Sequence, residues 1–203
     1  GELDGVPYLA LELVEGGTLA QKLNGTPWPP LAAAALISTL AGAVQFAHER
    51  GVVHRDLKPA NILWGAEPKI TDFGLAKTFD TRQPAPTQTG TILGTPNYMA
   101  PEQARGQSQQ IGFATDVYSL GAILYELLSG QPPFQSASAL ETLNQVLTRD
   151  PVSLERLQPR LPADLATIQQ VPMFSGLPPD QLRELLPDAW VQSYPAGIVL
   201  FCQ

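Results

Sequence analysis

The chain has 203 residues, of which 44% are hydrophobic, so it can form one ordinary domain with an apolar core and part of another. Its formal net charge is −7 and it contains no run of Lys or Arg, which argues against nucleic acid or an anionic membrane as a partner. The single cysteine, Cys202, excludes an intramolecular disulfide and fits a reducing cytoplasm. The acidic opening Gly1-Glu2-Leu3-Asp4 does not predict a signal peptide.

The first predicted element is a short apolar strand that ends in a glycine turn. Residues 6–14 are mostly apolar, and Gly16-Gly17 follows them. By composition alone, this segment is an ordinary edge strand and turn. No two glycines in the chain are separated by a single residue, so Gly16-Gly17 does not belong to a Gly-x-Gly-x-x-Gly phosphate-binding loop.

An apolar helix is predicted next. Leu31 to His48 contains no Asp, Glu, Lys or Arg over 18 residues, which reaches the lower limit for a membrane span. Pro29 and Pro30 suit the start of a helix, and Gly51 suits its cap. Its apolar residues at helical spacing are Leu36, Ile37, Leu40, Val44 and Ala47. The pattern favours a buried helix of a soluble protein over a membrane span.

Two short motifs then place polar residues at fixed intervals. Residues 54–63 read His-Arg-Asp-Leu-Lys-Pro-Ala-Asn-Ile-Leu, and Asp72-Phe73-Gly74 follows. Between them, two short apolar runs flank a turn at residues 65–67 and predict a β-hairpin that brings Asp72 back beside Asn61. An amide and a carboxylate supply hard oxygen ligands of the kind that Mg²⁺ prefers.

A third motif, Gly94-Thr95-Pro96-Asn97-Tyr98-Met99-Ala100-Pro101-Glu102, completes the set. A lone His-Arg-Asp is usually a surface turn, and a lone Asp-Phe-Gly is equally weak, but all three motifs in this order are specific. Together they resemble the protein serine/threonine kinase family, over roughly residues 6–168. Lys58 and Thr95 match the serine/threonine branch of that family better than the tyrosine branch.

The resemblance implies transfer of the γ-phosphate of ATP, with Mg²⁺, to a serine or threonine of a protein substrate. Asp56 would be the base that orients the acceptor hydroxyl, and Lys58 would stabilise the charge of the moving phosphate. Thr95 would contact both of them, while Asn61 and Asp72 would hold the metal. Because Lys58 lies two residues after Asp56, an extended loop would point both side chains the same way.

The resemblance also identifies residues 6–19 as the last strand of the small lobe and the hinge. Adenine would bond to the carbonyl of Glu12 and to the amide and carbonyl of Val14. Leu11 would be the gatekeeper, and Leu63 would also contact the cofactor. The downstream motifs favour this hinge over an ordinary edge strand.

The rest of the small lobe has no counterpart in these residues. The glycine-rich loop is missing, and none of the four lysines lies in a Val-Ala-Ile-Lys strand before the hinge. The predicted fold is therefore α+β and mainly α, with a kinase-like large lobe at residues 1–168 and a short helix and β-strand tail. Without the lysine clamp for ATP, the chain alone is expected to have little or no transferase activity.

Residues 75–99 are rich in Thr, Pro, Gln and Gly, as expected for the activation segment of the family. Thr87, Thr89 and Thr91 are candidate phosphorylation sites, and Arg55 would pair with an added phosphate. A solvated loop with unmodified threonines is the alternative.

A second buried helix is predicted from Asp116 to Gly130, before Pro132-Pro133. Its apolar residues are Val117, Leu120, Ile123, Leu124, Leu127 and Leu128. Asp116 or Thr115 would cap its start. The resemblance implies that Asp116 also holds the backbone of the catalytic loop.

The end of the chain departs from the kinase pattern. In the family, the glutamate of Ala-Pro-Glu pairs with a later arginine, and the segment that carries it is not found, so Glu102 is expected to lack that partner. Residues 171–182 and 194–201 resemble the start of a cyclic-nucleotide-binding domain, with a short helix and then a strand. The apolar residues of that helix are Leu182, Leu185 and Leu186.

Residues 169–203 would thus be the truncated start of such a domain. They lack its phosphate-binding cassette, so binding of a cyclic nucleotide is not predicted. The alternative is a generic amphipathic tail packed on the large lobe.

The sequence allows three functions: a kinase, a docking module and a cyclic-nucleotide sensor. The retained acidic, basic and amide residues of the motifs argue for a kinase and against a long-degenerate relative. The alternative is a kinase-derived docking or regulatory module, which would bind its protein partner equally well after Asp56→Asn. A cyclic-nucleotide sensor ranks lowest, because the cassette is missing.

Overall fold

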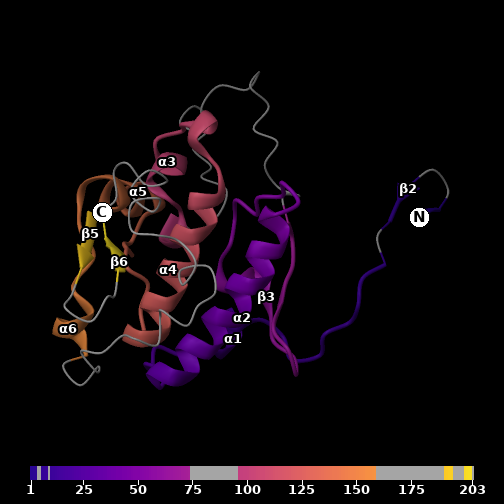
Figure 1. Ribbon diagram of the computed structural model, residues 1–203, viewed down its shortest axis with the longest axis horizontal. Helices are drawn as coiled ribbons and strands as arrows, with labels where there is room; N and C mark the ends of the chain where they lie inside the picture. The colour runs from indigo at the N-terminus through magenta and orange to yellow at the C-terminus, as the bar shows by residue number, and fades with distance from the viewer. Residues whose placement is uncertain (4–5, 9, 74–95, 159–189, 194–198, 203) are drawn as a thin grey trace.

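The computed structural model of the chain describes residues 1–3, 6–8, 10–73, 96–158, 190–193 and 199–202. The described part is mainly helical, and its strands pair as three antiparallel two-stranded sheets. Figure 1 shows the helices gathered in one body, with the N-terminal residues extending away from it. The predicted mainly helical α+β class is confirmed for these residues.

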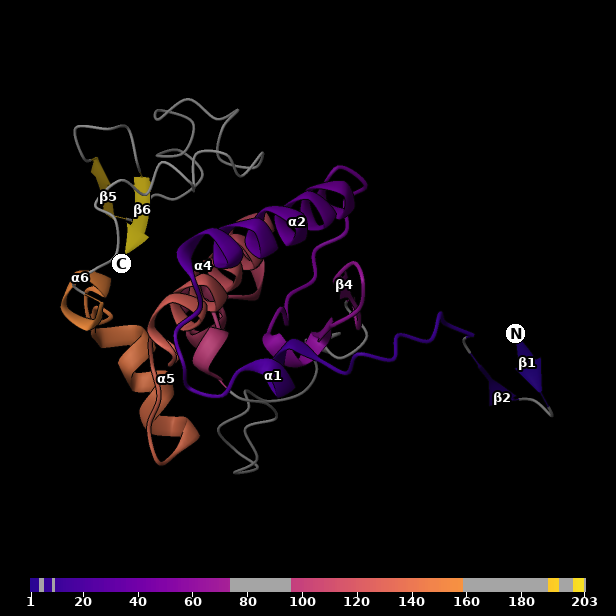
Figure 2. The ribbon, with the colours of Figure 1, turned by 90° about the horizontal axis from the view of Figure 1, so that it is seen from below.

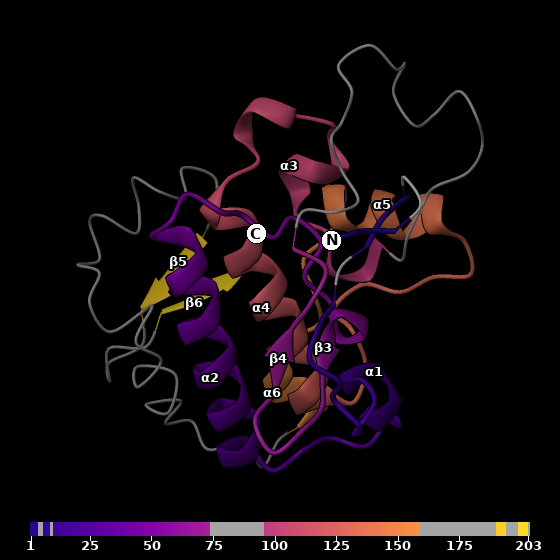
Figure 3. The same cartoon turned by 90° about the vertical axis from the view of Figure 1, so that its right-hand side faces the viewer.

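Two long helices, α2 (Pro30–His48) and α4 (Phe113–Ser129), form the centre of the body. Figures 2 and 3 show them side by side. Their facing side chains are almost fully buried, and each such Leu or Ile stabilises the fold by about 1.5–3 kcal/mol. The core they share with neighbouring loops includes Leu36, Ile37, Leu40, Val44, Leu57, Ile62, Leu120, Ile123 and Leu127.

The predicted apolar face of α2 is the face that packs in this core. Among the described helices, α2 alone is long and apolar enough to cross a membrane by length and composition. Its position against α4, with Leu40 and Val44 fully buried, is that of the core helix of a folded domain, as the sequence indicated. Leu31 and Phe46, on its other side, are exposed.

The start of α4 differs from the prediction. The helix begins at Phe113 and its N-cap residue is Gly112, so Asp116 lies inside the first turn. Neither Asp116 nor Thr115 is the N-cap residue, although the hydroxyl of Thr115 accepts the N–H of Gly112 at 3.3 Å. Its end was predicted correctly, because Gly130 adopts a left-handed φ of 82° and donates its N–H to the carbonyl of Glu126 at 2.7 Å.

The predicted hairpin is formed by β3 (Ile62–Leu63) and β4 (Lys69–Ile70), although each strand is only two residues long. Beyond the strands, the N–H of Thr71 donates to the carbonyl of Asn61 at 2.9 Å. The hairpin therefore returns the chain to Asn61 one residue before Asp72, as the sequence predicted.

The N-terminal strand is shorter than predicted. Among the described residues of this segment, 6–8 and 10–14, the strand is β2 (Val6–Pro7), which pairs with β1 (Glu2–Leu3). Residues 10–15 run without regular structure, and Leu11 and Leu13 are 76% and 82% exposed. In Figure 2 this segment leads away from the helices, so the described fold offers it no sheet to join.

The predicted Gly-Gly turn is confirmed. Gly17 has a φ of 76° and its carbonyl accepts the N–H of Trp64 at 2.8 Å. A Cβ on Gly16 would lie only 1.7 Å from the carbonyl oxygen of Trp64. The turn therefore packs directly on the chain that follows β3, and α1 (Leu19–Lys22) begins just after it.

The remaining elements complete the body. The 3₁₀ helices among the described residues are η1 (Pro59–Asn61), η3 (Pro96–Tyr98) and η4 (Ser108–Gln110). The other α-helices among them are α3 (Pro101–Ala104), α5 (Ala139–Thr148) and α6 (Leu154–Leu157). Near the C-terminus, β5 (Trp190–Ser193) pairs with β6 (Val199–Cys202). The predicted tail helix with Leu182, Leu185 and Leu186 lies outside the described residues.

Candidate active site

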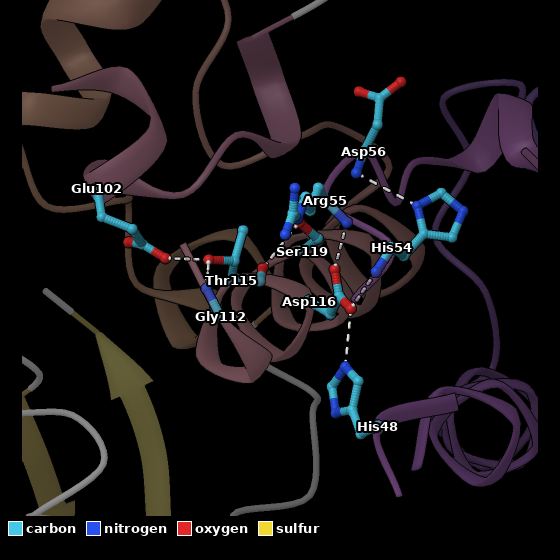
Figure 4. A network of polar contacts seen from close by, with 9 residues as sticks. All are labelled: His48, His54, Arg55, Asp56, Glu102, Gly112, Thr115, Asp116 and Ser119. Carbon is cyan, nitrogen blue, oxygen red and sulfur yellow. Dashed lines mark hydrogen bonds and ion pairs between the residues drawn. The ribbon is translucent and has the colours of Figure 1, made fainter. Parts of the chain in front are cut away.

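The loop that carries the first motif is held by one buried carboxylate. Asp116 is 1% exposed, and its Oδ2 and Oδ1 accept the N–H groups of His54 and Arg55, each at 2.8 Å. Its Oδ2 also accepts a hydrogen bond from Nε2 of His48 at 2.8 Å (Figure 4). A buried carboxylate is costly unless such donors satisfy it. The expected role of Asp116, holding the backbone of this loop, is confirmed.

His48 is a member of this network that the sequence did not single out. It is the last residue of α2, and its ring stacks on Phe113, with the ring centroids 4.5 Å apart. The contact joins the end of α2 to the start of α4. Its one sequence signal was weak: a polar ring at the end of an apolar helix, in a chain with only two histidines.

His54 links the loop to the second motif. Its Nδ1 accepts the N–H of Asp56 at 3.2 Å, so its Nε2 carries the hydrogen that is donated to the carbonyl of Thr71 at 2.9 Å. The ring is 1% exposed and contacts the ring of Phe73, at 4.7 Å between centroids. One buried imidazole thus fixes the backbone at Asp56 and the residue before Asp72.

Asp56 and Lys58 lie together, as predicted from their spacing. Nζ of Lys58 donates to Oδ2 of Asp56 at 2.8 Å, and the two side chains are 23% and 31% exposed. Lys58 is in an extended conformation, with φ −158° and ψ 162°, just before η1. The pair therefore combines a proton acceptor with a cation at a surface that substrate could reach.

Asn61 and Asp72 meet the requirements of a magnesium site in their donor chemistry. Nδ2 of Asn61 donates to the carbonyl of Asp56 at 2.9 Å, which leaves the amide oxygen as the atom for a cation. Asp72 is exposed and follows Thr71, whose backbone bonds to Asn61. Mg²⁺ is commonly held by one or two such oxygen ligands together with phosphate oxygens and water. The described residues contain no cluster of three His, Cys, Asp or Glu that would suit another kind of metal site.

Backbone strain is concentrated in the first and second motifs. Among the described residues other than glycine, Arg55 and Asp72 are the ones with left-handed φ, at 68° and 62°. Such a conformation costs about 1–3 kcal/mol and persists only where the surroundings impose it. Both residues belong to the motifs, which fits a site whose geometry is built by the fold.

Of the candidate hinge residues, Glu12 and Val14 lie against the hairpin, whereas Leu11 is exposed. The carboxylate of Glu12 pairs with Nζ of Lys69, on β4, at 2.6 Å. Val14 lies beside the turn of the hairpin, where a Cβ on Gly65 would be 3.1 Å from its Cγ1. Leu11, the predicted gatekeeper, is exposed.

Leu63, the other predicted cofactor contact, is half-buried on β3, opposite Lys69. It forms a β-bridge with Thr18, which follows the glycine turn. Leu63 therefore lies where the end of the candidate hinge meets the hairpin. Thr95, Thr87, Thr89 and Thr91 fall outside the described residues.

Glu102, which was expected to lack its arginine partner, is bound by a hydroxyl of α4. Its Oε1 accepts a hydrogen bond from Oγ1 of Thr115 at 2.6 Å. The same hydroxyl accepts the N–H of Gly112 at 3.3 Å (Figure 4). Thr115, on the first turn of α4, thus anchors the third motif to the helix that carries Asp116.

A second anchor joins the third motif to the C-terminal part of α4. The hydroxyl of Tyr98 donates to Oε2 of Glu126 at 2.5 Å. Burial raises the pKa of Glu126, and the hydrogen bond from Tyr98 opposes that rise. Burial also raises the pKa of Tyr98, with a further increase from Glu126, so Tyr98 remains the donor at all ordinary pH values.

A small cavity lies beside Asp56. It is lined by Arg55, Lys58, Tyr98, Gln103 and Ser119, among others, and its volume is about 10 Å³. That volume is close to the minimum for one water molecule and far below the several hundred Å³ of a typical ligand pocket. This cavity does not enclose a nucleotide.

Three comparisons with known proteins agree with the geometry. The family model described as "Protein kinase domain" matches residues 4–186. Serine/threonine-protein kinase PknB of Mycobacterium tuberculosis is 39% identical over 166 residues, which cover 80% of this chain and 26% of that protein. Serine/threonine-protein kinase PkaA of Streptomyces coelicolor is 47% identical over 150 residues, which cover 70% and 27%. The chain thus spans about a quarter of the length of the curated relatives it matches.

Among solved structures, the chain is similar to Rad53 1–466 in complex with AMP-PNP. The TM-score is 0.52 at 30% sequence identity, and the match covers 67% of this chain and 33% of that one.

Proposed function

The chain belongs to the protein kinase domain family, and from that premise we propose that it is the hinge and large lobe of a serine/threonine protein kinase. The observation that carries the proposal is the loop held by Asp116, which presents Asp56 and Lys58 as a pair beside Asn61. This arrangement supports transfer of the γ-phosphate of ATP to a serine or threonine hydroxyl of a protein.

The roles of the polar residues follow from their contacts. Asp56 accepts the hydrogen bond of the acceptor hydroxyl and orients its oxygen towards the phosphate. Lys58, which pairs with Asp56 in the structure, moves its ammonium to the phosphate oxygens as negative charge develops there. By the family resemblance, Thr95 would contact both. Each role requires its side chain to point at the reacting groups. The hydrogen bonds from Asp116 that fix the loop therefore serve catalysis as well as stability.

Asn61 and Asp72 are the proposed ligands of Mg²⁺. Bound there with ATP, the ion neutralises phosphate charge. The chain's own contribution is to set the two ligands: Asn61 through its bond to the carbonyl of Asp56, and Asp72 through the bonds at Thr71. Adenine would bond to the backbone of Glu12 and Val14, with Leu11 and Leu63 as apolar contacts.

The proposal is tested by phosphate transfer from radiolabelled ATP, using the protein expressed at its natural length. Asp56→Asn should lower kcat by about 10²–10⁴-fold, the usual contribution of a positioned base. Asp150→Asn, which removes an exposed carboxylate elsewhere, is the matched control and should transfer phosphate like wild type. Equal rates for wild type and Asp56→Asn would refute the assignment.

The division of the chain is part of the proposal. Residues 1–168 would be the partial kinase domain, and residues 169–203 the start of a cyclic-nucleotide-binding-like domain. The pairing of β5 with β6 supports a β-rich tail, while the family match reaches residue 186. The single cysteine supports a cytoplasmic location.

A docking module without catalysis is the second candidate. The exposure of Leu11 and Leu13 favours it, since an apolar segment held away from the core suits contact with another protein. Such a module would keep its partner affinity after Asp56→Asn, whereas a catalytic site would lose its turnover.

A further inference from the structure

The residue before Asp56 is held by its backbone on both sides. Arg55 has a left-handed φ of 68°, a conformation that a residue with a side chain rarely adopts. Its N–H donates to Oδ1 of Asp116 at 2.8 Å, and its carbonyl accepts Nε2 of Gln103 at 2.6 Å. The strained φ therefore lies between two hydrogen bonds that come from different helices.

The peptide group that joins Arg55 to Asp56 is fixed at both of its polar atoms. Its carbonyl accepts the hydrogen bond from Gln103, and its N–H donates to Nδ1 of His54 at 3.2 Å. A peptide group is planar, so these two bonds determine its orientation. That orientation sets the direction in which the Cα–Cβ bond of Asp56 leaves the loop.

Gln103 can serve in this way only with one orientation of its amide. It is half-buried on α3, immediately after the third motif, and its Oε1 accepts the N–H of Ala100 at 3.1 Å. Its Nε2 is then the atom that faces the carbonyl of Arg55. One side chain therefore both caps α3 and holds the catalytic loop.

We propose that Gln103 is a positioning residue for phosphoryl transfer: its amide N–H holds the Arg55–Asp56 peptide so that the Asp56 carboxylate points at the acceptor hydroxyl. The inference rests on the proposed kinase function. It also couples α3, and with it the end of the third motif, to the catalytic loop. A shift of α3 therefore turns the peptide that carries Asp56.

Two substitutions test the acceptor oxygen and the donor nitrogen of the Gln103 amide separately. Gln103→Glu has nearly the same shape and keeps an acceptor for the N–H of Ala100, but it places a carboxylate oxygen against the carbonyl of Arg55. Gln103→Lys keeps a donor for the carbonyl of Arg55 but loses the acceptor for Ala100. Gln109→Glu and Gln109→Lys make the same charge changes at an exposed residue of η4 and are the controls.

The first measurement is steady-state phosphate transfer with the protein at its natural length. Gln103→Glu should lower kcat at least tenfold with the KM for ATP within twofold of wild type, and Gln103→Lys should retain more of kcat. A role limited to capping α3 predicts the reverse order, because only Gln103→Glu keeps the cap. The reverse order, or a kcat for Gln103→Glu equal to that of Gln109→Glu, would overturn the proposal.

The second measurement does not need activity. Hydrogen exchange at the amides of residues 53–57 should be faster in Gln103→Glu than in Gln109→Glu, with exchange in the middle of α2 unchanged. Unchanged exchange at residues 53–57 would overturn the positioning role whatever the kinetics. If wild type transfers no phosphate, the proposed function fails, while the exchange result still decides whether Gln103 holds the loop.

Discussion

At the scale of single residues, Asp116 holds the loop that carries Asp56. Its carboxylate is the common acceptor for two backbone N–H groups of the catalytic loop and for His48. Without it, these buried donors have no acceptor, and each unsatisfied donor costs about 1–3 kcal/mol.

We therefore expect Asp116→Ala to lower the free energy of unfolding by about 3 kcal/mol or more, measured by urea denaturation. Asp116→Asn, which keeps one acceptor oxygen, should lose less. Asp150→Ala, at an exposed position, is the control and should stay within about 0.5 kcal/mol of wild type. A loss for Asp116→Ala no larger than for that control would show that the network does not stabilise the loop.

The Tyr98–Glu126 contact gives the fold a pH dependence. Because burial raises the pKa of Glu126, the native state binds its proton more tightly than the unfolded chain, in which a glutamate titrates near about 4.3. This contribution to stability is fully present below the unfolded value and is lost as pH rises through the native value.

Glu126→Gln cannot ionise and still offers an oxygen to Tyr98. Its free energy of unfolding, compared with that of wild type, should therefore rise as the pH is raised from about 4 to 8 across the window set by these two pKa values. Urea denaturation at several pH values measures the difference, and Glu67→Gln, on the exposed hairpin turn, controls for the loss of one carboxylate. A difference that is constant with pH would contradict a raised pKa at Glu126.

At the scale of elements, two glycines with different surroundings test how the hinge meets the hairpin. Gly16→Ala places a Cβ against the carbonyl of Trp64 and should destabilise the fold by about 1–3 kcal/mol. Gly42→Ala, in the exposed part of α2 with no atom near the new Cβ, should stabilise it by about 0.5–1 kcal/mol. Thermal unfolding measures both, and equal shifts in Tm for the two would argue against the close contact at Gly16.

The elements also show what the sequence could predict. The face of α2 and the hairpin were predicted correctly because apolar spacing and turn residues are local signals. The strand predicted at the start of residues 6–19 is shorter in the structure, because an edge strand forms only where a sheet receives it. The start of α4 was missed because its N-cap, Gly112, has no capping side chain.

The sequence also predicted the motif residues of the candidate site, but not the contacts that hold them. Asp56, Lys58, Asn61 and Asp72 were found because their spacing along the chain is itself the signal. The role of His48 and the bond between Glu102 and Thr115 were missed, because both contacts join separate helices. Hydrogen bonds of this kind appear only once α2, α3 and α4 have packed.

At the scale of the whole molecule, the described residues place Asp56 and Lys58 at the surface, beside a cavity too small for a nucleotide. The cavity beside Asp56 is water-sized, and residues 10–15 lead away from the helices. The 203-residue chain alone should therefore transfer little or no phosphate. Measurable Asp56-dependent transfer of phosphate from ATP by the pure 203-residue chain would contradict this expectation.

The most direct measurement of the central claim is phosphoamino-acid analysis of a protein substrate labelled from γ-radiolabelled ATP by the natural-length protein. The account predicts label on serine or threonine that depends on Mg²⁺ and disappears in Asp56→Asn. Label confined to tyrosine, or label that persists unchanged in Asp56→Asn, would contradict it.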